Sequence, residues 1–78
     1  MTAKTFILIE TVQGRSKEVV TALKKIDGVK SVDTVTGPYD IIAIVEGETL
    51  NDIDDLAFKI RPVAGISRTV TCLVMEGK

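Results

Sequence analysis

Histidine is absent from this sequence, which also has little of several other residue types that carry chemistry. Histidine is the commonest general base and metal ligand, so its absence argues against acid–base catalysis and a metal centre. The single cysteine, Cys72, cannot form a disulfide within the chain. Because it lies in an apolar run at 72–75, we expect it to pack as a small hydrophobic side chain rather than to act as a reactive thiol.

Two further absences concern the compartment and the partners. The sequence has no apolar run of about 18 residues and no signal-peptide pattern, so we expect a cytoplasmic protein with no membrane partner. Ten basic and eleven acidic residues nearly cancel. A balanced charge does not indicate binding to nucleic acid or to an anionic membrane. No cofactor is predicted.

What the chain does have is an excess of apolar residues for its size. Seventy-eight residues predict one domain over 1–78, yet 45% of them are hydrophobic and the mean hydropathy is +0.26. A domain of this size buries only about 60% of the surface that its unfolded chain exposes. The simplest place for the remaining apolar surface is an interface between subunits.

The pattern of apolar residues predicts four strands and two helices. One helix is expected over 16–25, with one face formed by Val19, Ala22, Leu23 and Ile26. A second helix follows Thr49, which resembles an N-cap with Asp52 as its capping-box partner, and ends before Pro62. Asp52, Asp54 and Asp55 are better explained by this helix start than by a metal site. The strands are expected at 4–12, 29–36, from the Gly37 turn to 46, and at 66–75.

The sequence also repeats itself weakly. A shift of 37 residues pairs Val19 with Leu56, Gly28 with Gly65 and Thr34 with Thr71. The order β-α-β-β-α-β predicts an α+β, ferredoxin-like βαββαβ sandwich, with a four-stranded antiparallel sheet and two helices on one face. The first and third strands, which are the most apolar, are expected at the centre of that sheet.

Helices on one face leave the other face of the sheet apolar and uncovered. Each exposed Leu or Ile forfeits about 1.5–3 kcal/mol of burial, so several of them predict a face-to-face dimer. Phe58 lies off the buried stripe of the second helix and is a candidate for a further contact.

The turn at 37–40 is the first place to look for a small-molecule site. Gly37 and Pro38 predict a tight reversal, and the chain's single tyrosine, Tyr39, stands next to the carboxylate of Asp40. From the residues alone, the simpler interpretation is a hairpin turn whose amides Asp40 satisfies. Similarly, Thr69 and Thr71 are good strand formers, and surface or inter-subunit ion pairs are a better explanation of Arg61 and Arg68 than binding to a ligand's carboxylate.

The order and spacing of three segments resemble the effector domain of the Lrp/AsnC transcription regulators, also called the RAM domain. These segments are Ile26-Asp27-Gly28-Val29, the run 34–40, and the run 63–71. The resemblance spans nearly the whole chain. It implies a dimeric α+β barrel that assembles into a higher oligomer, such as an octameric ring, and that binds an amino acid or a related metabolite where dimers meet.

Carried onto this sequence, the resemblance implies a ligand site of six residues: Gly37, Pro38, Tyr39, Asp40, Thr69 and Thr71. Asp40 would bind the ligand's ammonium, while the threonine hydroxyls and loop amides would bind its carboxylate. The first predicted strand begins close to Met1, so we expect a stand-alone form without the helix-turn-helix domain. Direct DNA binding and direct transcriptional control therefore do not carry over, and full-length Lrp/AsnC regulators are a candidate partner.

Two other classes of function stay open at this point. A small enzyme of the dimeric α+β barrel type would use the same dimer, but the chain has no histidine, and its central strands are expected to be bulky and apolar where a catalytic pocket would need small or polar residues. A purely structural oligomerisation domain is the other alternative. We expect a ligand-binding module without enzymatic activity.

Overall fold

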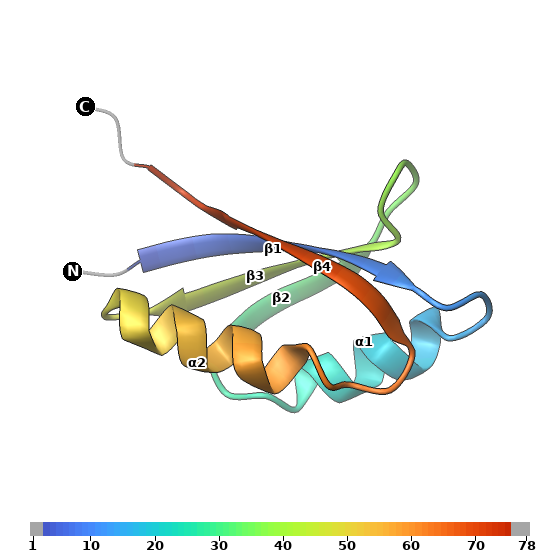
Figure 1. Cartoon of the computed structure of the whole chain (residues 1–78), viewed down its shortest axis with the longest axis horizontal. Helices are drawn as coiled ribbons and strands as arrows, with labels where there is room; N and C mark the ends of the chain where they lie inside the picture. The colour runs from blue at the N-terminus through green and yellow to red at the C-terminus, as the bar shows by residue number, and fades with distance from the viewer. Residues whose placement is uncertain (1–2, 76–78) are drawn as a thin grey trace.

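A computed structural model describes residues 3–75 of the chain and shows a single sheet with two helices beneath it (Figure 1). The elements follow the order βαββαβ. In chain order they are β1 (Ala3–Thr11), α1 (Ser16–Lys24), β2 (Val29–Thr34), β3 (Ile41–Gly47), α2 (Leu50–Ile60) and β4 (Ile66–Leu73). The ferredoxin-like fold predicted from the sequence is confirmed.

The four strands form one antiparallel sheet in the order β2-β3-β1-β4. The two most apolar strands, β1 and β3, are therefore central, as predicted. Their register places Ile7 opposite Ala43 and Ile9 opposite Ile41. Residues directly opposite each other project from the same face, so these pairs line one face of the sheet together.

Both helices cover this same face, and they do so with amphipathic surfaces (Figure 1). The capping box predicted at the start of α2 is present, since Thr49 Oγ1 accepts from the Asp52 amide at 3.2 Å and an Asp52 carboxylate oxygen accepts from the Thr49 amide at 3.1 Å. The same oxygen accepts from the Glu48 amide. Asp52 thus serves the helix start, which is the role that the sequence favoured over a metal ligand.

The core lies between the helices and the sheet. It contains the predicted stripe of α2 and two of the four residues predicted for α1, whereas Ala22 and Ile26 are half-buried. The buried hydrophobic residues are Ile7, Ile9, Val19, Leu23, Ile41, Ala43, Val45, Ile53, Leu56, Ala57 and Ile60. Thr5 is also fully buried, and its hydroxyl has no hydrogen-bond partner in the described part of the chain.

The opposite side of the sheet carries no helix, and we call it the open face. The register of β1 with β3 and β4 puts six apolar residues there: Phe6, Leu8, Ile42, Ile44, Val70 and Cys72. Most of them are half-buried in the single chain because neighbouring side chains shield one another. The uncovered apolar face that the sequence predicted is therefore present.

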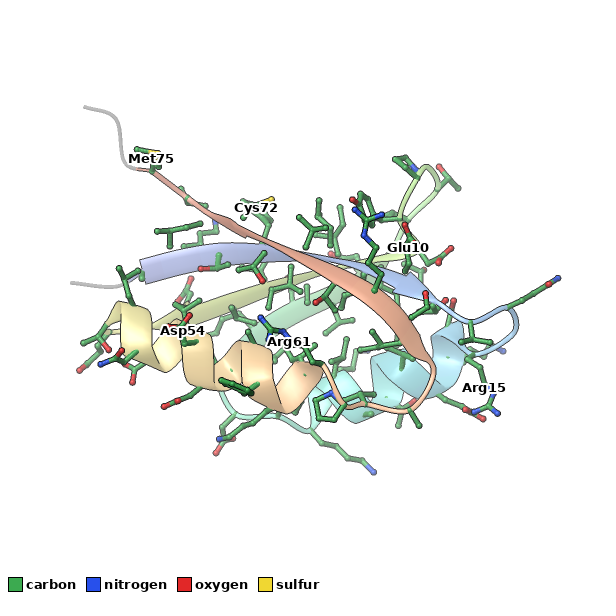
Figure 2. All side chains as sticks on the ribbon, viewed as in Figure 1. Glu10, Arg15, Asp54, Arg61, Cys72 and Met75 are labelled. Atoms are coloured by element: carbon green, nitrogen blue, oxygen red, sulfur yellow. The ribbon has the colours of Figure 1, made fainter. Side chains whose placement is uncertain are left out.

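Cys72 departs from its prediction, because it is exposed rather than packed as a buried hydrophobic residue. It lies on the edge strand β4 and projects toward the open face, on the side away from the helices (Figure 2). Strand ends also differ by one or two residues: β2 stops at Thr34 and β4 at Leu73. Neither helix within residues 3–75 has the length and apolar character needed to cross a membrane.

Candidate functional site

The hairpin between β2 and β3 forms the first half of the predicted site. It is closed by a hydrogen bond from the Val35 amide to the Asp40 carbonyl at 2.9 Å. Gly37 lies at the tip with a φ of +134°, a region that favours glycine, as predicted. The tip extends beyond the sheet on the side opposite the helices (Figure 1). Gly37 and Pro38 are exposed, and Tyr39 is half-buried.

Asp40 stands at the base of this hairpin and is tied to the end of β1. Its amide donates to the Ile9 carbonyl at 2.9 Å. Its Oδ2 accepts from the Thr11 amide at 2.8 Å and from the Thr11 hydroxyl at 3.3 Å. The carboxylate therefore satisfies a backbone amide, as the simpler interpretation predicted, although the amide belongs to β1 and not to the turn.

Thr69 and Thr71 form the second half of the predicted site, on β4. They pair with Ile9 and Ile7, whose side chains are in the core, so both threonines project toward the helix side of the sheet. The helices leave this strand largely bare, because α1 packs mainly on β2 while α2 packs on β3 and β1. Thr71 is accordingly exposed and Thr69 is half-buried.

The structure keeps these two halves apart within one chain. Strand β1 runs between them, since Ile9 pairs with Ile41 on one side and with Thr69 on the other. Two strand spacings amount to about 9–10 Å. The hairpin tip also projects from the opposite side of the sheet. The α-ammonium and α-carboxylate of an amino acid are bonded to the same carbon, so one ligand cannot bridge Asp40 and Thr71 of the same chain.

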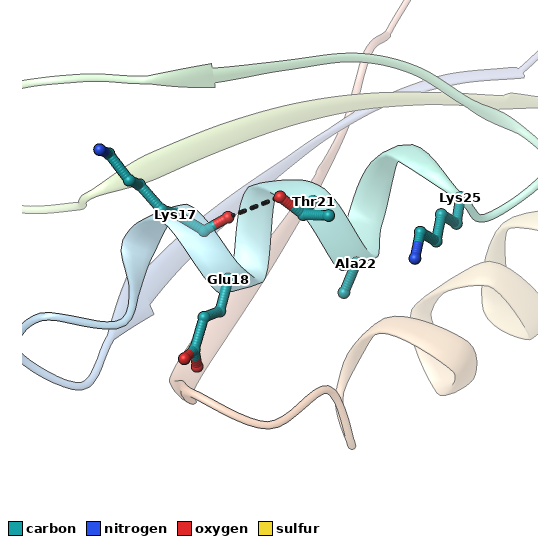
Figure 3. Close-up of a pocket in the computed structure, with 5 residues that line it drawn as sticks. All are labelled: Lys17, Glu18, Thr21, Ala22 and Lys25. Carbon is teal, nitrogen blue, oxygen red and sulfur yellow. Dashed lines mark hydrogen bonds between the residues drawn. The ribbon is translucent and has the colours of Figure 1, made fainter.

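Two hollows on the described part of the chain, residues 3–75, do not join the two halves either. One, at the start of β4, has a volume of about 220 Å³ and is lined by Arg61, Ile66, Ser67, Arg68 and Thr69. Another, of about 410 Å³, is lined by five residues from α1 and its C-terminal end, including Thr21, whose hydroxyl donates to the Lys17 carbonyl (Figure 3). It contains none of the predicted site residues.

Each of the two arginines considered above as a ligand for a carboxylate contacts another side chain. Arg68 lies 3.6 Å from Glu10 in an exposed ion pair across β1 and β4. The guanidinium of Arg61 lies 5.5 Å from the centre of the Phe58 ring. Phe58 itself is 71% exposed, as its position off the buried stripe predicted. The pairing of Arg68 agrees with the surface ion pair that the sequence favoured.

Residues 4–77 match the family model of the Lrp/AsnC ligand binding domain. The chain belongs to this family. The matched range contains all three segments on which the resemblance was based, 26–29, 34–40 and 63–71.

Solved structures extend the comparison to the fold. FFRP-DM1 is 36% identical, with a TM-score of 0.87, over 94% of this chain and 99% of that one. The hypothetical protein PHS023 from Pyrococcus horikoshii is also 36% identical, with a TM-score of 0.86, over 99% of this chain and 93% of that one. These two solved chains thus consist almost entirely of this one domain.

The domain also occurs within longer proteins. A transcriptional regulator from Neisseria meningitidis, NMB0573, solved as an L-Met complex, has a TM-score of 0.83 at 17% identity; the match covers 95% of this chain and 50% of that one. At that identity it shows the fold alone. Homocitrate synthase from Sulfurisphaera tokodaii is 40% identical over 58 residues. That match covers 74% of this chain but only 13% of the enzyme.

The structure adds two residues that the sequence did not single out. Thr11 contacts the Asp40 carboxylate, and the Thr11 hydroxyl lies 2.9 Å from the Ser16 hydroxyl at the start of α1. Asp40 is 29 residues away from Thr11 in the chain. No local pattern connects two residues at that separation, so the sequence alone does not predict the contact.

Proposed function

We propose that this chain is an amino-acid-sensing module whose ligand binds between copies of the chain. The observation that carries the proposal is the separation of the hairpin from Thr69 and Thr71 by β1. The chain belongs to a ligand-binding family. Because the two halves cannot meet within one chain, a complete site needs the hairpin of one chain and β4 of its neighbour.

The open face supplies the first contact of such an assembly. Because most of its apolar residues are already half-buried, each gains only part of the about 1.5–3 kcal/mol of full burial when a second sheet covers it. Two sheets packed in this way form a symmetric dimer. The hairpin tips extend beyond the sheet and the β4 edges carry little helix cover, so both can contact further copies of the chain. This arrangement supports a ring of dimers, such as an octamer.

The chemistry of the two halves suits an amino acid or a related metabolite. The Asp40 carboxylate attracts the ligand's ammonium, and charge-assisted hydrogen bonds of this kind are about twice as strong as neutral ones. Hydroxyls of Thr69 and Thr71, with amides of the hairpin, donate to the ligand's carboxylate. The L-Met complex of the Neisseria regulator supports an amino-acid ligand for this fold, although it does not identify the ligand of this chain.

The module acts by binding and not by catalysis. Its similarity to homocitrate synthase covers 13% of that enzyme, so the enzyme's reaction is not carried over. Among longer relatives the same fold occurs in transcriptional regulators, which supports full-length Lrp/AsnC regulators as partners in the cytoplasm. Direct contact with nucleic acid or membrane is not part of the proposal.

A thermal-shift screen with the twenty common amino acids tests the ligand class. A ligand at about 100 times its Kd stabilises the folded state by about 2.7 kcal/mol. We expect Asp40→Asn and Asp40→Ala to reduce the thermal stabilisation that the amino acid gives the protein, without unfolding the oligomer. If no amino acid stabilises the native protein, this proposal fails and the chain is a purely structural oligomerisation domain.

A mixing experiment tests whether the site is shared between chains. Asp40→Asn lacks the hairpin charge, and a Thr69→Val, Thr71→Val double variant lacks the hydroxyls of β4. When the two are refolded together, about one site in four combines an intact hairpin with an intact β4, because each half is drawn at random from two subunit types. Recovery of that fraction by calorimetry supports a shared site, whereas no recovery contradicts a site made of the hairpin of one chain and β4 of its neighbour.

A further inference from the structure

The Asp40 carboxylate is the endpoint of a chain of hydrogen bonds that begins on α1. Its Oδ2 receives the Thr11 amide at 2.8 Å and the Thr11 hydroxyl at 3.3 Å, and the Thr11 hydroxyl lies 2.9 Å from that of Ser16. All three residues are half-buried. Within residues 3–75, no hydrogen bond reaches the other carboxylate oxygen, Oδ1.

The direction of these hydrogen bonds follows from the donors available. An ionised carboxylate can only accept, so the single hydroxyl proton of Thr11 points to Asp40. The Thr11 oxygen is then the acceptor for the Ser16 proton. Each bond polarises the next toward the carboxylate, which strengthens the chain. Ser16 thus connects the start of α1 with the base of the hairpin through Thr11.

We infer that Thr11 is a positioning residue for the Asp40 carboxylate, with Ser16 behind it. This inference rests on the proposed function, because it assigns the two carboxylate oxygens different roles. Oδ2 is held by Thr11 and fixes the base of the hairpin. Oδ1 is left to meet the cationic group of a ligand at the contact with a neighbouring chain.

The surroundings explain why the hairpin needs this support. Its tip is exposed and projects beyond the sheet (Figure 1). At its base, the Val35 amide donates to the Asp40 carbonyl and the Asp40 amide donates to the Ile9 carbonyl, both at 2.9 Å. A side-chain anchor at Asp40 therefore limits the movement of the loop at the same residue that carries the charge.

Amide hydrogen exchange on the ligand-free protein tests the anchor. Thr11→Val keeps the shape and the backbone amide of Thr11 but removes the hydroxyl. We expect exchange at the Val35 and Asp40 amides to become about 3- to 10-fold faster, the range for losing one net hydrogen bond. Thr11→Ser should restore the native rate. Thr21→Val is the matched control, since it removes a hydroxyl bond to the Lys17 carbonyl elsewhere on α1.

Two results would overturn the inference. One is unchanged exchange at Val35 and Asp40 in Thr11→Val. The other is an equal acceleration at the amides of β1 and β3, which would mean that the whole domain had been destabilised.

A second measurement separates this inference from the proposed function. Binding of the twenty common amino acids is measured for the native protein, Thr11→Val and Thr11→Ser. Thr11→Val should weaken binding about 3- to 10-fold and Thr11→Ser should restore it. If the native protein binds none of them, the proposed function fails, while the exchange rates still decide whether Thr11 positions the hairpin. Full affinity in Thr11→Val would contradict the positioning role.

Discussion

Gly28→Ala should destabilise the domain strongly, because two separate penalties meet at this residue. Gly28 has a φ of +97°, and an added Cβ would lie 2.9 Å from both Cδ atoms of Leu56. The left-handed backbone costs an L-residue about 1–2 kcal/mol. Leu56 is only 7% exposed, so its displacement adds about 1–3 kcal/mol of overpacking. We expect a total loss of about 2–5 kcal/mol in the free energy of unfolding.

Urea denaturation at one fixed protein concentration measures this loss, since an oligomer's stability depends on its concentration. Gly14→Ala is the matched control. Gly14 also has a positive φ, +83°, but nothing lies within 4 Å of an added Cβ, so only the backbone penalty of about 1–2 kcal/mol applies. If Gly28→Ala costs no more than Gly14→Ala, the steric argument is refuted.

The close contact at Gly28 has a counterpart in the other half of the repeat. A Cβ at Gly65 would lie 2.9 Å from Cγ2 of Val19. The 37-residue shift that pairs Gly28 with Gly65 also pairs Leu56 with Val19. Each glycine that follows one helix thus packs against the buried stripe of the other helix. This reciprocal contact gives the weak sequence repeat a structural cause.

Two further predictions concern the core and the open face. Thr5→Val should leave stability unchanged or raise it by about 1–3 kcal/mol, because the buried hydroxyl of Thr5 has no partner; a loss in urea denaturation would show that this hydroxyl is satisfied in solution. Leu8→Lys should reduce the particle mass in light scattering, because a charge on the open face opposes face-to-face packing. Leu50→Lys, at a residue that is 60% exposed on α2, should leave the mass unchanged, and an equal effect of the two variants would contradict the assignment of the interface.

Much of the fold could be predicted from the sequence, because the patterns that indicate it lie between residues close together in the chain. The stripe Ile53, Leu56, Ala57 and Ile60 recurs at helical spacing, and all four residues are buried. The Thr49 capping box involves residues three apart, and the structure contains it. The uninterrupted apolar runs of β1 and β3 identified the central strands. These features depend on neighbours in the chain, so the order of residues is enough to determine them.

The tertiary structure decided which distant residues meet. The sequence placed Asp40, Thr69 and Thr71 in one site, but pairing of β1 with both β3 and β4 puts a strand between them. It also brings Thr11 to Asp40 across 29 residues, and it leaves Cys72 exposed on an edge that the helices do not cover. Apolar spacing determines which face of an element is buried. The register and order of strands, which depend on contacts far apart in the chain, determine what each polar residue faces.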